Sequence, residues 1–208
     1  MNRRTYLRAS VTAVGVTAFA GCLASGGGED VPAPVDLSGT KFDYQGGMEI
    51  GAHGGPNGQI FYKDKQPRPA VAGGADGDTS SPENLAWFHT LVFGLFPYHF
   101  DRQSRGWETD VIYVTDYSLV DWDIAADESR PVMPSPTSAE MFAEASELTY
   151  VGGSEVIGGM GPALHPFSDS GEATSFVENY GGDTYEFDEI NQALVESLQA
   201  NSEQEMEM

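Results

Sequence analysis

The stretch LTYVGGSEVIGGMGPALHPFSDSGEATSFVENYGGDTYEF, residues 148–187, carries the clearest fold signal in the chain. Leu148–Val151 is rich in residues that favour strands, and Ala163–Phe167 reads as a second extended segment. Between them lies the glycine-rich loop Gly158–Pro162, which breaks the pattern as a turn would. We expect two neighbouring strands here, joined by a loop that carries Met160 at its centre.

The rest of the same stretch predicts a helix and a further strand. Ser168 or Ser170 begins a helix that runs to Tyr180, and a glycine pair follows it, as is common past a helix C-terminus. Thr184–Phe187 then predicts a strand. Residues 148–190 therefore predict one β-β-α-β unit.

The first half of the chain shows a similar order. A glycine-rich loop around Met48 precedes a strand at Gln59–Tyr62, and a buried strand is expected at Asp110–Thr115. Between them, Pro82–Tyr98 predicts a helix with one apolar face at helical spacing. That face comprises Leu85, Phe88, Val92 and Phe96. The fold class predicted is α+β, with two small β-β-α-β units in tandem and a C-terminal helix, and the first unit spans 42–129.

The two units are joined and followed by simpler segments. Residues 130–147 form a proline-rich connection with a short helix candidate at Thr137–Ser146. A last helix is expected at Glu189–Leu198, so that 191–208 comprises C-terminal helix and acidic tail.

The N-terminus has the features of a secretion signal in residues 1–21. Arg3 and Arg4 precede the apolar run Val11–Ala20, which is shorter than the about 20 residues that a membrane span needs. The arginine pair indicates the twin-arginine route. Small residues before Cys22 form a lipobox, so we expect Cys22 to be lipidated and the protein to lie on the outer face of the cell membrane. A secreted protein with a free thiol and an uncleaved anchor are the alternatives. Residues 22–41 are expected to form a flexible tether.

The charge balance excludes several classes of partner. After the signal peptide the chain has 32 acidic against 7 basic residues. Nucleic acid and anionic lipid headgroups need clustered Lys and Arg, so neither is expected, and the membrane is reached through the lipid anchor. A normal apolar content of 40% with such an acidic surface indicates adaptation to high salt, where repulsion is screened.

Two methionines stand out because each lies within a run of glycines. They are Met48, after Gly46 and Gly47, and Met160 in the loop described above. A thioether is a soft, neutral ligand that suits Cu(I), and it resists oxidation better than a thiol outside the cell. The alternative is that each methionine fills an irregular gap beneath its loop.

A histidine could complete this ligand set. His53 lies five residues after Met48, and His165 lies close after Met160 and competes for the same role. Either could instead be a histidine without such a role. No catalytic arrangement is recognisable: the sequence has no Gly-x-Ser-x-Gly, no CxxC, no HExxH and no phosphate loop, so we do not expect an enzyme.

Several blocks together resemble one known family. Tyr150–Ser168 resembles the signature stretch of NosL-type lipoproteins, the accessory proteins of nitrous oxide reductase. Asn179–Ile190 is similar to the C-terminal block of that family, Tyr113–Tyr117 to its central strand, and Gly46–Gln59 to its metal loop. The similarity spans most of the chain after the signal peptide.

The resemblance implies a lipid-anchored copper chaperone. Members of the family bind Cu(I) and pass it on, by way of an ABC-type membrane complex, for copper-site assembly in nitrous oxide reductase. Met48 and Met160 match the methionines of the two family loops, and the implied fold is two β-β-α-β units. Gly46 stands where the family usually has cysteine. The alternative is a NosL-like scaffold that docks on a membrane transport complex without binding metal.

Overall fold

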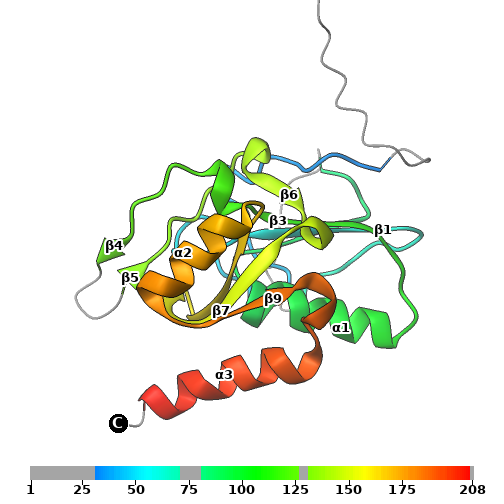
Figure 1. The fold of residues 1–208 in the computed structure, drawn as a ribbon. Coiled ribbons are helices and arrows are strands. Elements are labelled where there is room, and N and C mark those ends of the chain that lie inside the picture. Colours follow the sequence, from blue (N-terminus) through cyan, green and yellow to red (C-terminus); the bar gives the residue numbers. More distant parts are fainter. Residues whose placement is uncertain (1–30, 71–80, 127–130, 207–208) are drawn as a thin grey trace, which may run out of the picture. The chain divides into compact units, whose positions relative to one another are not determined.

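The computed structural model describes residues 31–70, 81–126 and 131–206. Arg3 and Arg4 of the predicted signal peptide, and the predicted lipidation site Cys22, lie outside the described residues. The order of helices and strands is drawn in Figure 1.

The first half of the chain forms a four-stranded antiparallel sheet with strand order β2-β1-β3-β6. Its strands are β1 (Gly58–Tyr62), β2 (Leu85–Phe88), β3 (Thr109–Thr115) and β6 (Phe142–Glu144). Every residue of the edge strand β2 and of its neighbour β1 is buried. This side of the sheet is therefore covered on both faces, which explains why both strands are largely apolar.

The helix predicted at Pro82–Tyr98 is wrong. Leu85–Phe88 is strand β2, which pairs with β1 and buries all four of its side chains. A π-helical turn η1 (Leu91–Leu95) follows, and only then does helix α1 (Phe96–Ser104) begin. Pro97 lies in the first turn of α1, where proline is favoured, and not at a helix end. The unit is still β-β-α-β, in the order β1, β2, α1, β3.

The second half forms the second sheet, with order β4-β5-β7-β8 and with β9 paired to β7. Its strands are β4 (Ala125–Ala126), β5 (Pro131–Val132), β7 (Thr149–Gly158), β8 (Gly161–Phe167) and β9 (Asp183–Glu186). Helix α2 (Ser170–Tyr180) starts after Asp169, whose side chain accepts hydrogen bonds from the first turn, and ends at Gly181 with φ 74°. The predicted second β-β-α-β order is confirmed, as β7, β8, α2 and β9.

Residues 131–147, the described part of the connection between the units, contain no α-helix. Residues 137–146, predicted as a helix, comprise a 3₁₀ turn η3 (Ala139–Met141), strand β6 and the start of another 3₁₀ turn, η4 (Ala145–Glu147). Pairing with a distant strand determines the conformation of this segment, because β6 extends the first sheet by pairing with β3. A further 3₁₀ turn, η2 (Tyr117–Leu119), follows β3.

The tether predicted over residues 22–41 is wrong for its second part. Leu37 is completely buried, and its amide donates to the Thr137 carbonyl over 2.8 Å. The Gln59 side chain accepts from the Val35 amide and donates to the Val35 carbonyl. Val31–Met208 forms one compact unit, so the folded part begins earlier than Phe42.

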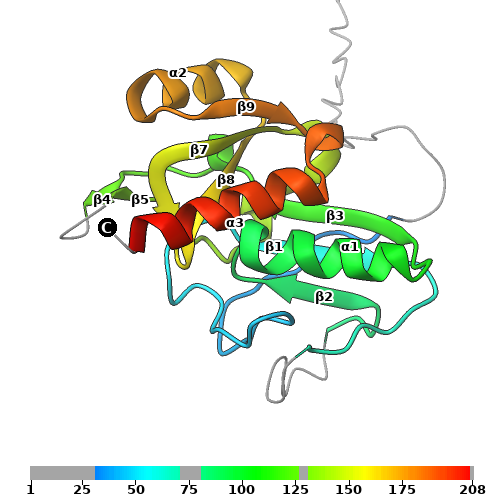
Figure 2. The ribbon, with the colours of Figure 1, turned by 90° about the horizontal axis from the view of Figure 1, so that it is seen from below.

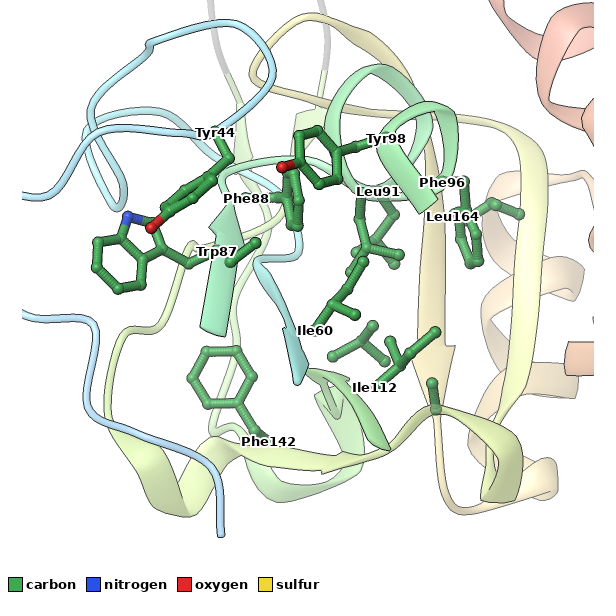
Figure 3. Close-up of a cluster of buried hydrophobic side chains, with 14 of the residues drawn as sticks. Tyr44, Ile60, Trp87, Phe88, Leu91, Phe96, Tyr98, Ile112, Phe142 and Leu164 are labelled. Atoms are coloured by element: carbon green, nitrogen blue, oxygen red, sulfur yellow. The ribbon is translucent and has the colours of Figure 1, made fainter. Parts of the chain in front are cut away.

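The two sheets share one main core, part of which is shown in Figure 3. Ile60 and Ile112 of the first sheet meet Leu91 and Phe96 of the helical segment, and Leu164 of the second sheet reaches the same cluster. Figure 3 also places Tyr44, near the N-terminus of the described chain, among Trp87, Phe88 and Tyr98.

Helix α3 (Gln192–Met206) closes this core after a 3₁₀ turn, η5 (Phe187–Glu189). It begins later and extends further than predicted. Figure 2 shows it running alongside α1, and its residues Val195 and Leu198 are buried in the shared core. Among the described residues, no helix is both long and apolar enough to cross a membrane.

Candidate metal site

Met48 lies in a tight loop that closes on itself. The Asp43 amide donates to the Met48 carbonyl over 2.7 Å, and the Gly47 amide donates to the Asp43 carbonyl over 3.0 Å. Gly47 has φ 71°, a conformation that glycine adopts without strain. Phe42 and Glu49 form a single antiparallel bridge at the base of this loop. Met48 is half-buried at its closing end.

The segment that follows Met48 packs on the second sheet. The Gly55 amide donates to the Met133 carbonyl over 2.8 Å, just beyond strand β5. Gly55 has φ 105°, and a Cβ atom added there would lie 2.8 Å from Gly158 Cα. The two glycine-rich segments therefore touch backbone to backbone, which only residues without side chains allow.

This packing places His53 against the turn that carries Met160. Gly159 lies so close to His53 that a Cβ atom added to Gly159 would be 2.5 Å from His53 Cβ. Both His53 and Met160 are exposed, Met160 to 47%. Met160 therefore fills no gap beneath its loop, and its sulfur is accessible to a ligand or a partner.

His165 occupies a different environment. It is completely buried on β8, and its ring packs 5.1 Å from that of Phe176 and 5.9 Å from that of Tyr117. Burial lowers the pKa of His165 to about 3, so the imidazole is neutral at ordinary pH. A side chain inside an aromatic core fits a structural role, and of the two candidate third ligands His53 is the accessible one.

The surroundings of His53 and Met160 lack formal charge. Segments 50–62, 131–139 and 156–167 contain no Asp, Glu, Lys or Arg. They meet at the site, because Gly55 faces Gly158 and the Asn57 side chain donates to the Pro136 carbonyl over 2.8 Å. A neutral region with thioether and imidazole groups favours a soft cation such as Cu(I) over hard cations, which prefer charged oxygen ligands. The described residues contain no group of three or more His, Cys, Asp or Glu placed to hold a metal ion.

Comparisons with known proteins identify the family of this chain. The NosL family model matches residues 34–195. The chain belongs to the NosL family. The crystal structure of the copper chaperone NosL from Shewanella denitrificans superimposes with a TM-score of 0.55 at 26% sequence identity, covering 80% of this chain and 97% of that one. No curated protein matches. The resemblance to NosL seen in the sequence is thus confirmed.

Membership of the NosL family draws attention to position 46, where this chain has glycine. Gly46 is exposed and directly follows the turn that begins at Asp43. A Cβ atom added there would meet one atom within 4 Å, Asp43 Oδ1 at 3.8 Å, which is ordinary van der Waals contact. The backbone of the Met48 loop thus has room for the cysteine that the family resemblance implies, although the side chain is missing.

The pair of Asp43 and His89, which supports the Met48 loop from beneath, was not predicted from the sequence. The Asp43 carboxylate is completely buried and lies 2.9 Å from His89 Nδ1. Asp43 followed by Tyr-Gln-Gly-Gly is a local turn signal and could have been noticed. The pairing with His89 could not, because it depends on where β2 ends in the fold.

Proposed function

We propose that this protein is a lipid-anchored Cu(I)-binding accessory protein on the outer face of the cell membrane, and that it delivers copper for nitrous oxide reductase maturation. Met48 and Met160 are the thioether ligands in this proposal, and His53 is the third ligand. An ABC-type membrane complex is the proposed partner in transfer, and nitrous oxide reductase the client. The role is binding and transfer, without catalysis.

One observation carries the proposal: the His53 segment is seated directly on the Met160 turn in a NosL-family fold. These loops are distant in sequence, and a metal site needs them together. An imidazole and two thioethers form a neutral set that suits Cu(I). Exposure of Met160 and His53 suits handover, because a partner's ligand can reach the metal without unfolding the donor.

The test is an anaerobic Cu(I) titration against a competing chromogenic chelator in high salt. It uses the chain from residue 23 onward, which contains the whole compact unit Val31–Met208. We expect one-to-one binding that Met48→Leu, Met160→Leu and His53→Ala each weaken. Met141→Leu, which changes a methionine outside both glycine-rich loops, serves as the matched control and should bind as the unaltered protein does.

A scaffold without metal is the second candidate, and the absence of a cysteine at position 46 favours it. A docking role predicts that Met48→Leu and Met160→Leu leave association with the membrane complex unchanged and that the unaltered protein does not compete for Cu(I). Co-purification of each variant with the complex, measured beside the titration, distinguishes the two functions.

A further inference from the structure

A buried pair of Asp43 and His89 lies beneath the Met48 loop, and the proposed function does not use it. Asp43 Oδ2 lies 2.9 Å from His89 Nδ1, with side-chain exposures of 0% for Asp43 and 3% for His89. Taking a carboxylate out of water is costly unless hydrogen bonds replace the lost hydration. The contacts of this carboxylate therefore indicate what its burial achieves.

Those contacts tie two segments together. Asp43 Oδ1 accepts from the amides of Gln45 at 2.7 Å and Gly46 at 2.5 Å, both within the Met48 loop. Asp43 Oδ2 accepts from the backbone amide and from Nδ1 of His89, each at 2.9 Å, at the end of strand β2. Three backbone amides can only donate, so the carboxylate is the acceptor throughout and His89 Nδ1 carries a proton.

The same residue also closes the loop through its backbone. The Asp43 amide and carbonyl make the bonds to Met48 and Gly47 described above, so Asp43 contacts the loop at both ends. On the side away from the loop, the Asp43 carboxylate packs against the η1 turn: a Cβ atom added to Gly94 would lie 3.0 Å from Asp43 Oδ2. The carboxylate thus fits a space that the π-helical turn leaves open by having glycine there.

We propose that Asp43 and His89 are positioning residues that hold the Met48 loop in the conformation that binds the metal. The inference rests on the copper-binding function proposed above. Asp43 Oδ1 holds the loop by accepting from its amides, and Asp43 Oδ2 attaches the loop to the end of strand β2. The Nδ1–H of His89 holds the carboxylate in this orientation. Neither residue touches the metal; both act through the position of Met48.

The experiment compares Asp43→Asn and His89→Leu with a matched control, Asp116→Asn. Asp116 is also buried, and its Oδ1 accepts from the amides of Ser118 and Ser168, outside the Met48 loop. Circular dichroism and thermal unfolding in high salt establish that each variant is folded. Cu(I) affinity comes from chelator competition, and the number of sulfur ligands from X-ray absorption at the copper edge.

We expect Asp43→Asn and His89→Leu to weaken Cu(I) binding about 10-fold or more, as loss of supporting hydrogen bonds does at other metal sites. The sulfur count should fall from two to one. Asp116→Asn should lower thermal stability and leave both readouts unchanged. His89→Asn, whose amide can replace the Nδ1–H donor, should restore most of the affinity that His89→Leu loses.

Double substitutions decide whether the effect passes through Met48. In a Met48→Leu background, Asp43→Asn should cause no further loss of Cu(I) affinity. In a Met160→Leu background it should lower Cu(I) affinity as much as it does in the unaltered protein. Equal losses in both backgrounds, or unchanged affinity and two sulfurs in Asp43→Asn and His89→Leu, would overturn the inference. If Met48→Leu itself binds normally, the ligand assignment fails and the inference with it; if only Met48→Leu weakens binding, the inference alone fails.

Discussion

Gly46 stands where the family resemblance implies a cysteine. The loop at this position has room for a side chain. We predict that Gly46→Cys folds normally, because the added Cβ meets only Asp43 Oδ1, at 3.8 Å. A thiolate adds a negative charge that the neutral thioethers lack, so Cu(I) binding should tighten by at least about 10-fold, or about 1.4 kcal/mol. Chelator competition at several pH values measures this.

The pH dependence provides the check on Gly46→Cys. A thiol must lose its proton to bind, so the gain in affinity should grow as pH rises toward the ordinary thiol pKa of about 8.5. Gly46→Ser has the same Cβ without the thiol and should bind as the unaltered protein does. An equal gain in Gly46→Ser would show that the effect comes from the loop backbone.

His165 is the residue that links stability to pH. Burial holds its folded-state pKa at about 3, below the unfolded value of 6.5. As pH falls below 6.5, His165 binds a proton in the unfolded chain but stays neutral in the folded protein. The free energy of unfolding therefore decreases between pH 6.5 and about 3. Each pH unit in this window costs about 1.4 kcal/mol.

We predict that His165→Phe removes this loss. The ring of Phe can occupy the same aromatic core beside Phe176 and Tyr117 without titrating. Between pH 6 and pH 4 the unaltered protein should lose roughly 2 kcal/mol more unfolding free energy than His165→Phe. Denaturant unfolding at the two pH values measures the difference, and parallel loss in both proteins would contradict a neutral buried His165.

At the scale of elements, the contact between the two glycine-rich loops should control the site. Gly55 and Gly106 both have positive φ, 105° and 76°, but only Gly55 faces another segment, with Gly158 Cα 2.8 Å from an added Cβ. Gly106→Ala therefore measures the conformational cost alone, about 1–2 kcal/mol. Gly55→Ala should cost more and should also weaken Cu(I) binding, because it pushes His53 away from the Met160 turn.

Thermal unfolding and chelator competition on the same two variants test this prediction. Gly106→Ala is the matched control: it should be less stable than the unaltered protein and bind Cu(I) equally well. Normal copper affinity in Gly55→Ala, with the variant folded, would show that the site does not depend on this contact between loops.

The elements that the sequence predicted correctly are those with local signals. Strands β7 and β8 are joined by a glycine turn, and α2 has its cap and terminal glycine within a few residues of its ends. Strand β2 lacked such a signal. LAWFHTLVFGL, residues 85–95, is mostly apolar, and such a stretch fits a buried strand as well as a buried helix. Its pairing with β1 shows that the first four residues form a strand.

The same distinction applies to the candidate site. Met48 and Met160 were recognisable because methionine is unusual within a run of glycines. The seating of His53 on Gly159 and the pairing of Asp43 with His89 join segments distant in sequence, so they follow from the packing of the whole unit. Local patterns identified the candidate ligands, and the fold was needed to find what holds them.

At the scale of the whole molecule, the larger of two buried clusters of the described residues is shared by both β-β-α-β units, and the smaller one lies between α2 and the second sheet. Tyr150 and Leu164 of the second sheet lie in the same cluster as Ile60 and Leu91 of the first, and α3 adds Val195 and Leu198. The two halves should therefore unfold together, because neither can lose its packing without exposing the shared cluster.

The acidic surface of this shared unit predicts a strong dependence on salt. Residues 22–208 include 32 acidic and 7 basic residues, and the repulsion among the excess negative charges destabilises the compact state wherever it is not screened. The screening length falls from about 10 Å at 0.1 M to about 3 Å at 1 M salt. We predict that the thermal midpoint of unfolding rises steeply as KCl is increased over this range.

Sucrose separates screening from a general stabilisation of compact states. It is excluded from protein surfaces and favours folding, but it does not screen charge. KCl should therefore raise the midpoint far more than sucrose of equal osmolality, and the advantage of KCl should shrink at low pH, where the carboxylates are protonated. Equal stabilisation by the two solutes would assign the effect to water exclusion, and the excess of acidic residues would then need another explanation.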